Sequence, residues 1–272
     1  QLSDELTLVN RHRDAIDARQ QALAIHAACG TRLRQGRAER MLARLCWFDG
    51  GAKGPSTRWA QRAIDTLSAL PLSRELALAH STMSHLCLVG EDMTGAQTWG
   101  LRAIEGAELA DDAEAMSHAL NNVACAILRQ RDDALAWERL ARSRELALQH
   151  GLVADAARAY NNLFILSVVQ HDFAGGLRWA EQGLAFCEAN GLDVFTVRIG
   201  IRRAFARIVM GQWERAAEEL ADIAGRHAPS PMESATHAFV SSLLALRRGE
   251  ADAAPRLDAS VAAMHEHRVE IW

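Results

Sequence analysis

The chain has 272 residues, of which 49% are hydrophobic and 24% are charged, with only 5 prolines and a single tyrosine. This composition excludes a disordered or fibrous protein, and its richness in Leu and Ala favours helix over strand. A formal net charge of −4 gives no general attraction to nucleic acid or to an anionic membrane. No apolar run approaches the ~20 residues that span a bilayer, and nothing resembles a signal peptide, so a cytoplasmic protein is expected.

The sequence predicts helices of about 15–20 residues that alternate with short turns. The first segment covers residues 2–28, with a break near Asn10 and Arg11. Helix pairs follow, and their first members are expected at residues 31–48, 74–89, 112–129, 153–170, 192–210 and 231–248. Their second members are expected at residues 56–69, 93–109, 133–149, 173–189, 212–226 and 251–266. No segment has the alternating pattern of a strand, so the fold class is all-α.

Glycine and capping residues mark the predicted helix ends. Six glycines follow helical segments, at Gly30, Gly90, Gly151, Gly191, Gly211 and Gly249. A left-handed residue commonly closes a helix at this position, and Leu152 and Leu192 add the apolar residue of a Schellman motif. The run Ser230-Pro-Met-Glu233 predicts a capping box at the start of the last pair.

A period of about 40 residues connects the helix pairs. Tryptophans recur at one position of the second helices, at Trp59, Trp99 and Trp179, with Arg139 in the missing place. Turn residues recur at the same interval, at Asp92, Asp132, Asp172 and Gln212. This repetition predicts an α-solenoid of about six hairpins that forms one domain over residues 1–272. The tryptophans are interpreted as packing between repeats rather than as a surface that stacks ligands.

The residues from Ala157 to Gly176 resemble the tetratricopeptide (TPR) signature, and those from Arg198 to Ala216 resemble a degraded copy of it. The usual TPR period is about 34 residues, so these hairpins are longer. The long form is similar to the sensor arrays of bacterial LuxR/MalT-type (STAND) ATP-dependent transcriptional regulators, through phrases such as Trp179–Cys187 and Gly211–Ala217. The resemblance implies a right-handed superhelix with the first helices on its concave face. It also implies that the chain is a fragment of a longer regulator, with ATPase and DNA-binding domains flanking it.

Polar residues recur on the first helices with the 40-residue period. Two copies of an Asn-Asn pair lie in Ser117–Ala124 and Ala157–Phe164. One register reads Met41, Thr82, Asn122, Asn162, Arg202 and Val240, and the register one turn earlier reads Leu78, His118, Arg158, Arg198 and Thr236. Residues four apart share a helix face, so a polar ladder is predicted. Its members are His118, Asn122, Arg158, Asn162, Arg198 and Arg202.

The ladder suits an extended peptide, a protein segment or a small anionic effector. A carboxamide both donates to and accepts from a peptide backbone, and a guanidinium pairs with carboxylate or phosphate. TPR peptide clamps carry Asn and Arg or Lys at the register of Asn122, Asn162 and Arg202, so the resemblance implies the same role. The alternative is that the Asn side chains hydrogen-bond within the array and the Arg side chains are merely solvated. Asn121 and Asn161, one position off, are expected to serve packing or rim contacts.

No local motif predicts catalysis or a cofactor. The run from Gly50 to Thr57 lacks the Lys-Ser/Thr ending of a phosphate loop and is expected to be a turn. His265 and His267 point to different helix faces, and no metal-ligand spacing is found. The five cysteines form no C-x-x-C pair and are interpreted as small buried hydrophobic residues in a reducing compartment.

The sequence therefore predicts a non-catalytic binding domain of a bacterial signalling or transcriptional regulator, without cofactor, metal, nucleic-acid or membrane contact of its own. The alternative is a structural scaffold for self-association or intramolecular docking. An enzyme is a distant third, because no acid/base pair, nucleophile or metal set is evident.

Overall fold

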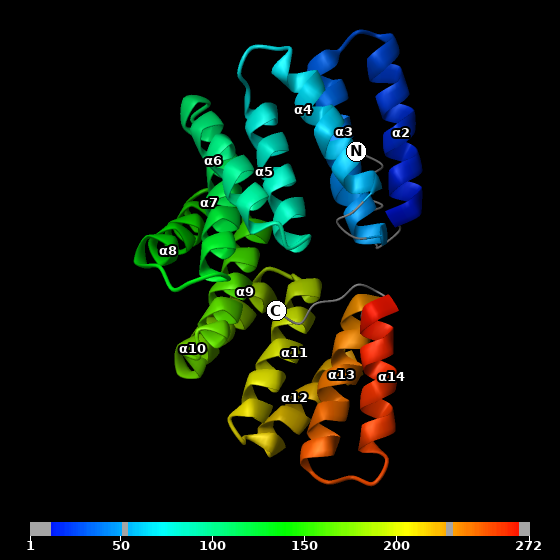
Figure 1. Ribbon diagram of the computed structural model, residues 1–272, viewed down its shortest axis with the longest axis vertical. Helices are drawn as coiled ribbons and strands as arrows, with labels where there is room; N and C mark the ends of the chain where they lie inside the picture. The colour runs from blue at the N-terminus through cyan, green and yellow to red at the C-terminus, as the bar shows by residue number, and fades with distance from the viewer. Residues whose placement is uncertain (1–11, 51–53, 227–230, 267–272) are drawn as a thin grey trace. The chain divides into compact units, whose positions relative to one another are not determined.

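The computed structural model describes residues 12–50, 54–226 and 231–266, and these residues form helices and no strand (Figure 1). Among these described residues, helix α2 (His12–Ala28) comes first and six antiparallel pairs follow it. The first helices are α3 (Arg32–Gly50), α5 (Arg74–Val89), α7 (Ala113–Leu128), α9 (Val153–Val169), α11 (Asp193–Val209) and α13 (Pro231–Arg247). The second helices are α4 (Pro55–Ser68), α6 (Met93–Leu109), α8 (Ala134–Gln149), α10 (Phe173–Ala189), α12 (Trp213–Arg226) and α14 (Ala253–Glu266).

The all-α class and the order of first and second helices are confirmed. Every predicted pair has its two helices where the sequence places them, and the ends shift by at most a few residues. The expected start of the first segment, residues 2–11, lies outside the described residues. Within the described part of the chain, no helix is both long and apolar enough to cross a membrane.

Two turns show the predicted Schellman geometry. The Leu152 N–H donates to the Ala147 carbonyl at 2.8 Å, and the Leu192 N–H donates to the Cys187 carbonyl at 2.9 Å. The glycines before these leucines have φ of 65° and 64°, in the left-handed region that glycine adopts without strain. The chain therefore leaves α8 and α10 by the same route.

The prediction for Gly90 is wrong, because this glycine has a φ of −91°. Its N–H still bonds the Leu86 carbonyl, so helical hydrogen bonding continues one residue further than expected. Glu91 takes the left-handed place instead, with a φ of 62°. The next N–H, of Asp92, then closes the turn on the Cys87 carbonyl at 2.9 Å.

Aspartates cap three of the second helices, α6, α8 and α10. The Asp92 carboxylate accepts from the Gly95 N–H and the Asp172 carboxylate from the Gly175 N–H, both at 2.8 Å. In α8 the cap is Asp133, whereas Asp132 accepts from the Trp137 indole. Each cap satisfies one of the donors that a helix leaves unpaired at its start. Ser230 of the predicted capping box lies outside the described residues.

The chain divides into two compact units, Gln1–Asp155 and Ala156–Trp272. In the first unit, Ala60, Ile64 and Leu67 of α4 pack with α3 and α5, and Trp59 and Trp99 both cover this cluster. In the second unit, one cluster joins α9, α10 and α11, with Trp179 against it, and another joins α11, α12 and α13. Trp59, Trp99 and Trp179 therefore pack between repeats, as predicted. The expectation of a single domain over residues 1–272 stays a prediction.

Candidate functional site on the first helices

In the first unit, Ser81 of α5 makes polar contacts with α7. The Asn122 amide donates to the Ser81 carbonyl at 2.9 Å, and the Ser81 hydroxyl lies 2.7 Å from His118 Nδ1. Asn122 has no exposed surface, whereas His118 is half-buried. Asn122 was predicted to bind a ligand, but in the structure its carboxamide lies inside the protein and joins two helices. It is therefore left out of the binding face proposed below.

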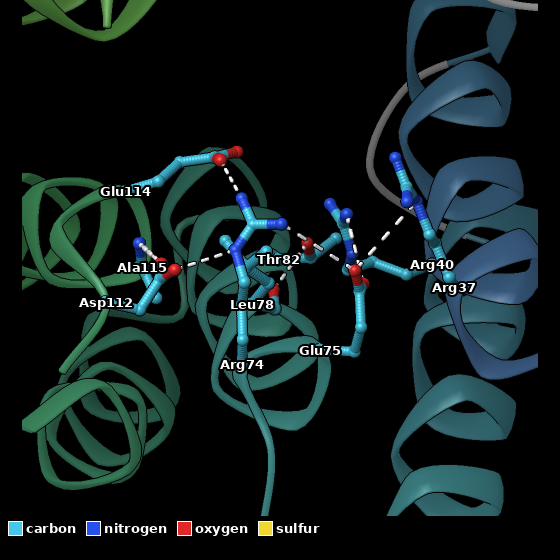
Figure 2. Close-up of polar contacts among 9 residues, drawn as sticks. All are labelled: Arg37, Arg40, Arg74, Glu75, Leu78, Thr82, Asp112, Glu114 and Ala115. Carbon is cyan, nitrogen blue, oxygen red and sulfur yellow. Dashed lines mark hydrogen bonds and ion pairs between the residues drawn. The ribbon is translucent and has the colours of Figure 1, made fainter. Parts of the chain in front are cut away.

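A chain of ion pairs runs across α3, α5 and α7 in the same unit (Figure 2). The Glu75 carboxylate lies 3.4 Å from the Arg40 guanidinium, and 3.9 Å from both Arg37 and Arg74. Arg74 also reaches Asp112 at 2.7 Å and pairs with Glu114. Opposite charges thus alternate from α3 to α7, over the first turns of α5 and α7.

The Arg40–Glu75 pair is the buried part of this network. The Arg40 side chain keeps 6% of its surface exposed and the Glu75 side chain 10%. Burial lowers the pKa of Arg40 to about 10, because the charged guanidinium loses hydration that Glu75 only partly replaces. A pair of this kind adds little net stability but is costly to break from one side.

In the second unit, Asn161 and Asn162 of α9 form a short relay with Arg202 of α11. Arg202 donates to Asn161 Oδ1 at 2.7 Å, and the Asn161 amide donates to Asn162 Oδ1 at 3.0 Å. Asn161 is buried, and Asn162 and Arg202 are half-buried. Of the packing or rim contacts expected for Asn161, the structure shows a buried residue that links two predicted ladder residues.

Arg198 lies one turn from Arg202 on α11. It donates to Glu233 of α13 at 2.8 Å, and its guanidinium lies 5.7 Å from the centre of the Phe195 ring. Burial and, to a lesser extent, the neighbouring Arg198 charge lower the pKa of Arg202 to about 9, while Glu233 opposes the shift. Two guanidiniums of α11 and one carboxylate of α13 therefore act on one another here.

Among the predicted ladder residues, the structure brings two pairs together. Asn162 of α9 and Arg202 of α11 meet through Asn161, whereas His118 and Asn122, both on α7, meet at Ser81 of α5. Arg158 of α9 is half-buried. The assignment of Arg158, Asn162, Arg198 and Arg202, together with His118, to a ligand-binding face stays a prediction.

Salt bridges between first helices were not among the features predicted from the sequence. Arg40 with Glu75 and Arg198 with Glu233 are both 35 residues apart. In each pair an arginine of one first helix meets a glutamate in the first turn of the next first helix, where the helix dipole favours negative charge. A search for Arg and Glu separated by slightly less than one repeat would have found both pairs.

Among the described residues, no group of three or more His, Cys, Asp or Glu side chains could hold a metal ion. All five cysteines are free thiols. Cys125 and Cys187 are buried as predicted, Cys46 and Cys87 are half-buried, and Cys29 is exposed. The prediction that every cysteine is buried is thus wrong at Cys29, which lies in the turn that follows α2.

No protein-family model matches the sequence, and the search of curated proteins gives no match. Solved structures do match. The apo form of RapI has a TM-score of 0.68 and 10% identity, over 98% of this chain and 96% of that chain. A Rap protein complexed with competence and sporulation factor has a TM-score of 0.71 and 13% identity, over 98% and 74%. Aspartyl phosphate phosphatase F from Bacillus subtilis has a TM-score of 0.62 and 12% identity, over 96% and 69%.

This likeness shows the fold. The chain is an all-α, TPR-like superhelical repeat protein, similar in architecture to the Rap proteins. The likeness spans nearly the whole chain, so it supports the repeat assignment of the first pairs as well as that of the clearest TPR copy. The low sequence identity leaves the role of individual residues to the geometry described above.

Proposed function

We propose that the chain is a non-catalytic, cytoplasmic binding domain that holds an extended peptide or protein segment against its first helices. A small anionic effector is the alternative ligand, because its negative charge would pair with the same arginines. The ligand contacts lie on α9 and α11, at Arg158, Asn162, Arg198 and Arg202. One similar solved structure is named as a complex with a competence and sporulation factor, which makes a regulatory ligand a reasonable expectation for this fold.

The observation that carries this proposal is the charge imbalance on α11. Arg198 and Arg202 lie one turn apart, and Glu233 is the carboxylate that opposes both of them. Asn162 of α9 is linked to them through Asn161, whose amide donates to Asn162 Oδ1. A carboxylate placed here would compensate the desolvated guanidinium, and a carboxamide is a group that can both donate to and accept from a peptide backbone.

The test uses random dodecapeptides displayed on phage, selected on the immobilised chain. The selected peptides are then synthesised with a fluorescent label and titrated by anisotropy. Relative to wild type, the Asn162→Ala/Arg202→Gln variant is expected to bind roughly 10–100-fold more weakly, which corresponds to the loss of one or two hydrogen bonds that involve a charge. Gln at position 202 can still donate to Asn161, so the fold is retained.

Arg178→Gln is the matched control, because Arg178 is an exposed arginine on the second helix α10. Its removal is expected to leave peptide affinity within about twofold of wild type. If no peptide is enriched, the binding function is wrong. If peptides bind but the double variant binds as well as wild type, the function stands and the ladder is not the site.

We further propose that this domain belongs to a LuxR/MalT-type transcriptional regulator. The support is the resemblance of Trp179–Cys187 and Gly211–Ala217 to the sensor arrays of those proteins. The complete reading frame tests this proposal, because it should encode a phosphate-loop ATPase before the array and a helix-turn-helix after it. A reading frame without both domains contradicts the regulator assignment and leaves the binding function in place.

A structural scaffold is the second candidate, and the burial of Asn122 favours it. A ladder residue that joins α5 to α7 contributes to rigidity rather than to recognition. A scaffold for self-association predicts concentration-dependent assembly that light scattering would detect. It also predicts that the Asn162→Ala/Arg202→Gln variant assembles like wild type.

A further inference from the structure

Helix α3 carries far more positive than negative charge. Five arginines lie on it within four turns, at Arg32, Arg34, Arg37, Arg40 and Arg44. The acidic residue among them, Glu39, has a side chain with 1% of its surface exposed and accepts from Arg62 of α4 at 3.4 Å. Glu39 is therefore directed into the α3–α4 hairpin, and its charge is not available at the outer surface of α3.

Three of these arginines share one face of α3. Arg37, Arg40 and Arg44 are spaced by three and four residues, so they lie along one side of the helix. Arg37 and Arg44 are exposed, and they are about 10 Å apart along the axis. Arg32 is five residues before Arg37, which places it roughly 140° away around the helix. We name Arg37, Arg40 and Arg44 the α3 arginine face.

The carboxylates around this face do not balance it. The Glu75 carboxylate forms ion pairs with Arg40 and Arg37, but it also pairs with Arg74, so its charge is shared among three arginines (Figure 2). Among the described residues, Arg44 has no carboxylate within ion-pair distance, and Arg40 Nε, although buried, has no hydrogen-bond partner. The neighbouring Arg44 and Arg37 charges also lower the pKa of Arg40, after burial and against Glu75. An added anion would relieve this excess.

We propose that the α3 arginine face docks an acidic segment of a partner protein, with carboxylates that reach Arg37 and Arg44 over two helical turns. This surface lies in the first unit and uses none of the ladder residues. It is therefore a second docking site, independent of the peptide site proposed on α9 and α11.

An acidic protein segment fits this surface better than a nucleic acid does. The exposed arginines span only about two helical turns, whereas a duplex presents a phosphate about every 1.7 Å along its axis and binds an extended field of positive charge. Beyond Glu75 the same network ends in Asp112 and Glu114, which would repel a longer polyanion (Figure 2). The net charge of −4 adds no attraction at long range. A short segment with a few carboxylates needs only the two exposed arginines and does not extend to Asp112 and Glu114.

The experiment measures the binding of a fluorescein-labelled deca-glutamate peptide at low ionic strength, with deca-glutamine as the uncharged reference. Wild type is expected to bind only the glutamate peptide, and affinity should fall with added salt, because exposed charges are screened. Arg37→Gln/Arg44→Gln is expected to weaken binding roughly 3–10-fold, the range for two exposed ion pairs. The buried Arg40–Glu75 pair stays intact in this variant, and circular dichroism checks the fold.

Arg32→Gln is the matched control, since it removes an exposed arginine of the same helix that lies well around the helix from both Arg37 and Arg44. It should retain wild-type affinity to within about twofold. The proposal is overturned if Arg32→Gln weakens binding as much as the double variant, or if deca-glutamate does not bind. It is also overturned if Asn162→Ala/Arg202→Gln abolishes binding while the α3 variant does not, or if a 12-base-pair DNA duplex binds more tightly than the peptide.

Discussion

Asn122 has the residue type and repeat position of a ligand-binding residue, but its buried position gives it a structural role. Its position in the repeat matches that of Asn162, yet Asn122 is fully buried and donates to Ser81, whereas Asn162 is half-buried beside Arg202. The Asn122 amide reaches the Ser81 carbonyl of the preceding first helix, whereas Asn162 Oδ1 accepts from Asn161 of its own helix. Residue type and spacing alone do not distinguish the two cases.

Replacing Asn122 with alanine is therefore expected to destabilise the fold. The change removes a buried hydrogen bond and leaves the Ser81 carbonyl with one partner fewer, which costs about 1–3 kcal/mol. Urea denaturation of the wild type and the variant measures the difference. Gln182→Ala, at an exposed position of α10, should change the free energy of unfolding by less than about 0.5 kcal/mol. Equal effects in the two variants would contradict the structural role of Asn122.

The cysteines allow a second test at this scale. Burial raises the pKa of the Cys187 thiol to about 11, so at pH 8 on the order of 0.1% of it is thiolate, the reactive form. Cys87 has a pKa of about 11 as well, through burial and the nearby Asp92 carboxylate. Iodoacetamide at pH 8, followed by peptide mass mapping, should label the exposed Cys29 first. Labelling of Cys187 at a comparable rate in the folded protein would show that α10 is packed differently.

At the scale of elements, close approach between helices depends on glycine. An ideal Cβ at Gly36 of α3 would lie 2.4 Å from Leu67 Cγ, and Leu67 is fully buried in α4. Gly36→Ala is therefore expected to destabilise the protein by roughly 1–3 kcal/mol through overpacking, despite the better helix propensity of alanine. Thermal or urea unfolding provides the measurement.

Gly225 of α12 is the control for this prediction, because an added Cβ there meets nothing within 4 Å. Gly225→Ala should leave stability unchanged or raise it by up to about 1 kcal/mol, since alanine favours helix. A neutral or stabilising effect of Gly36→Ala would contradict the close approach of Gly36 in α3 to Leu67 in α4.

Helix caps give a further prediction for the elements. Asp172→Ala removes the side chain that accepts from the Gly175 N–H at the start of α10, which should cost about 1 kcal/mol. Asp132→Ala, at the matching place of the repeat, should cost less, because Asp133 caps α8 there. The two free energies of unfolding are compared directly. An equal loss in both variants would contradict the assignment of the α8 cap to Asp133 instead of Asp132.

Across the whole molecule, the sequence predicts the helices well because their signals are local. Apolar periodicity, glycine after a helix and aspartate before one all act within a few residues, and the pairs lie where these signals place them. Gly90 was the exception because the neighbouring Glu91 accepts the left-handed conformation. The 40-residue period correctly predicted the tryptophan packing, since the same contact recurs in successive repeats.

The candidate site was harder to predict, because it depends on what a neighbouring first helix supplies. The Asn161–Asn162 pair is evident in the sequence, but its link to Arg202 depends on how α9 and α11 are set against each other. The Arg40–Glu75 pair joins residues 35 apart, and each belongs to a run with other charged residues nearby. Residue type alone does not decide the pairing within such runs, and the separation of slightly less than one repeat is the additional signal that both pairs share.

The central claim is that the first helices of the second unit, α9 and α11, hold the ligand. Hydrogen exchange measured by mass spectrometry, with and without a peptide selected on the chain, tests it most directly. We expect slower exchange in the peptides that cover Arg158–Asn162 and Arg198–Arg202, with no change in those that cover the second helices α10 and α12. Protection confined to α10 and α12, or none at saturating peptide, would contradict the claim.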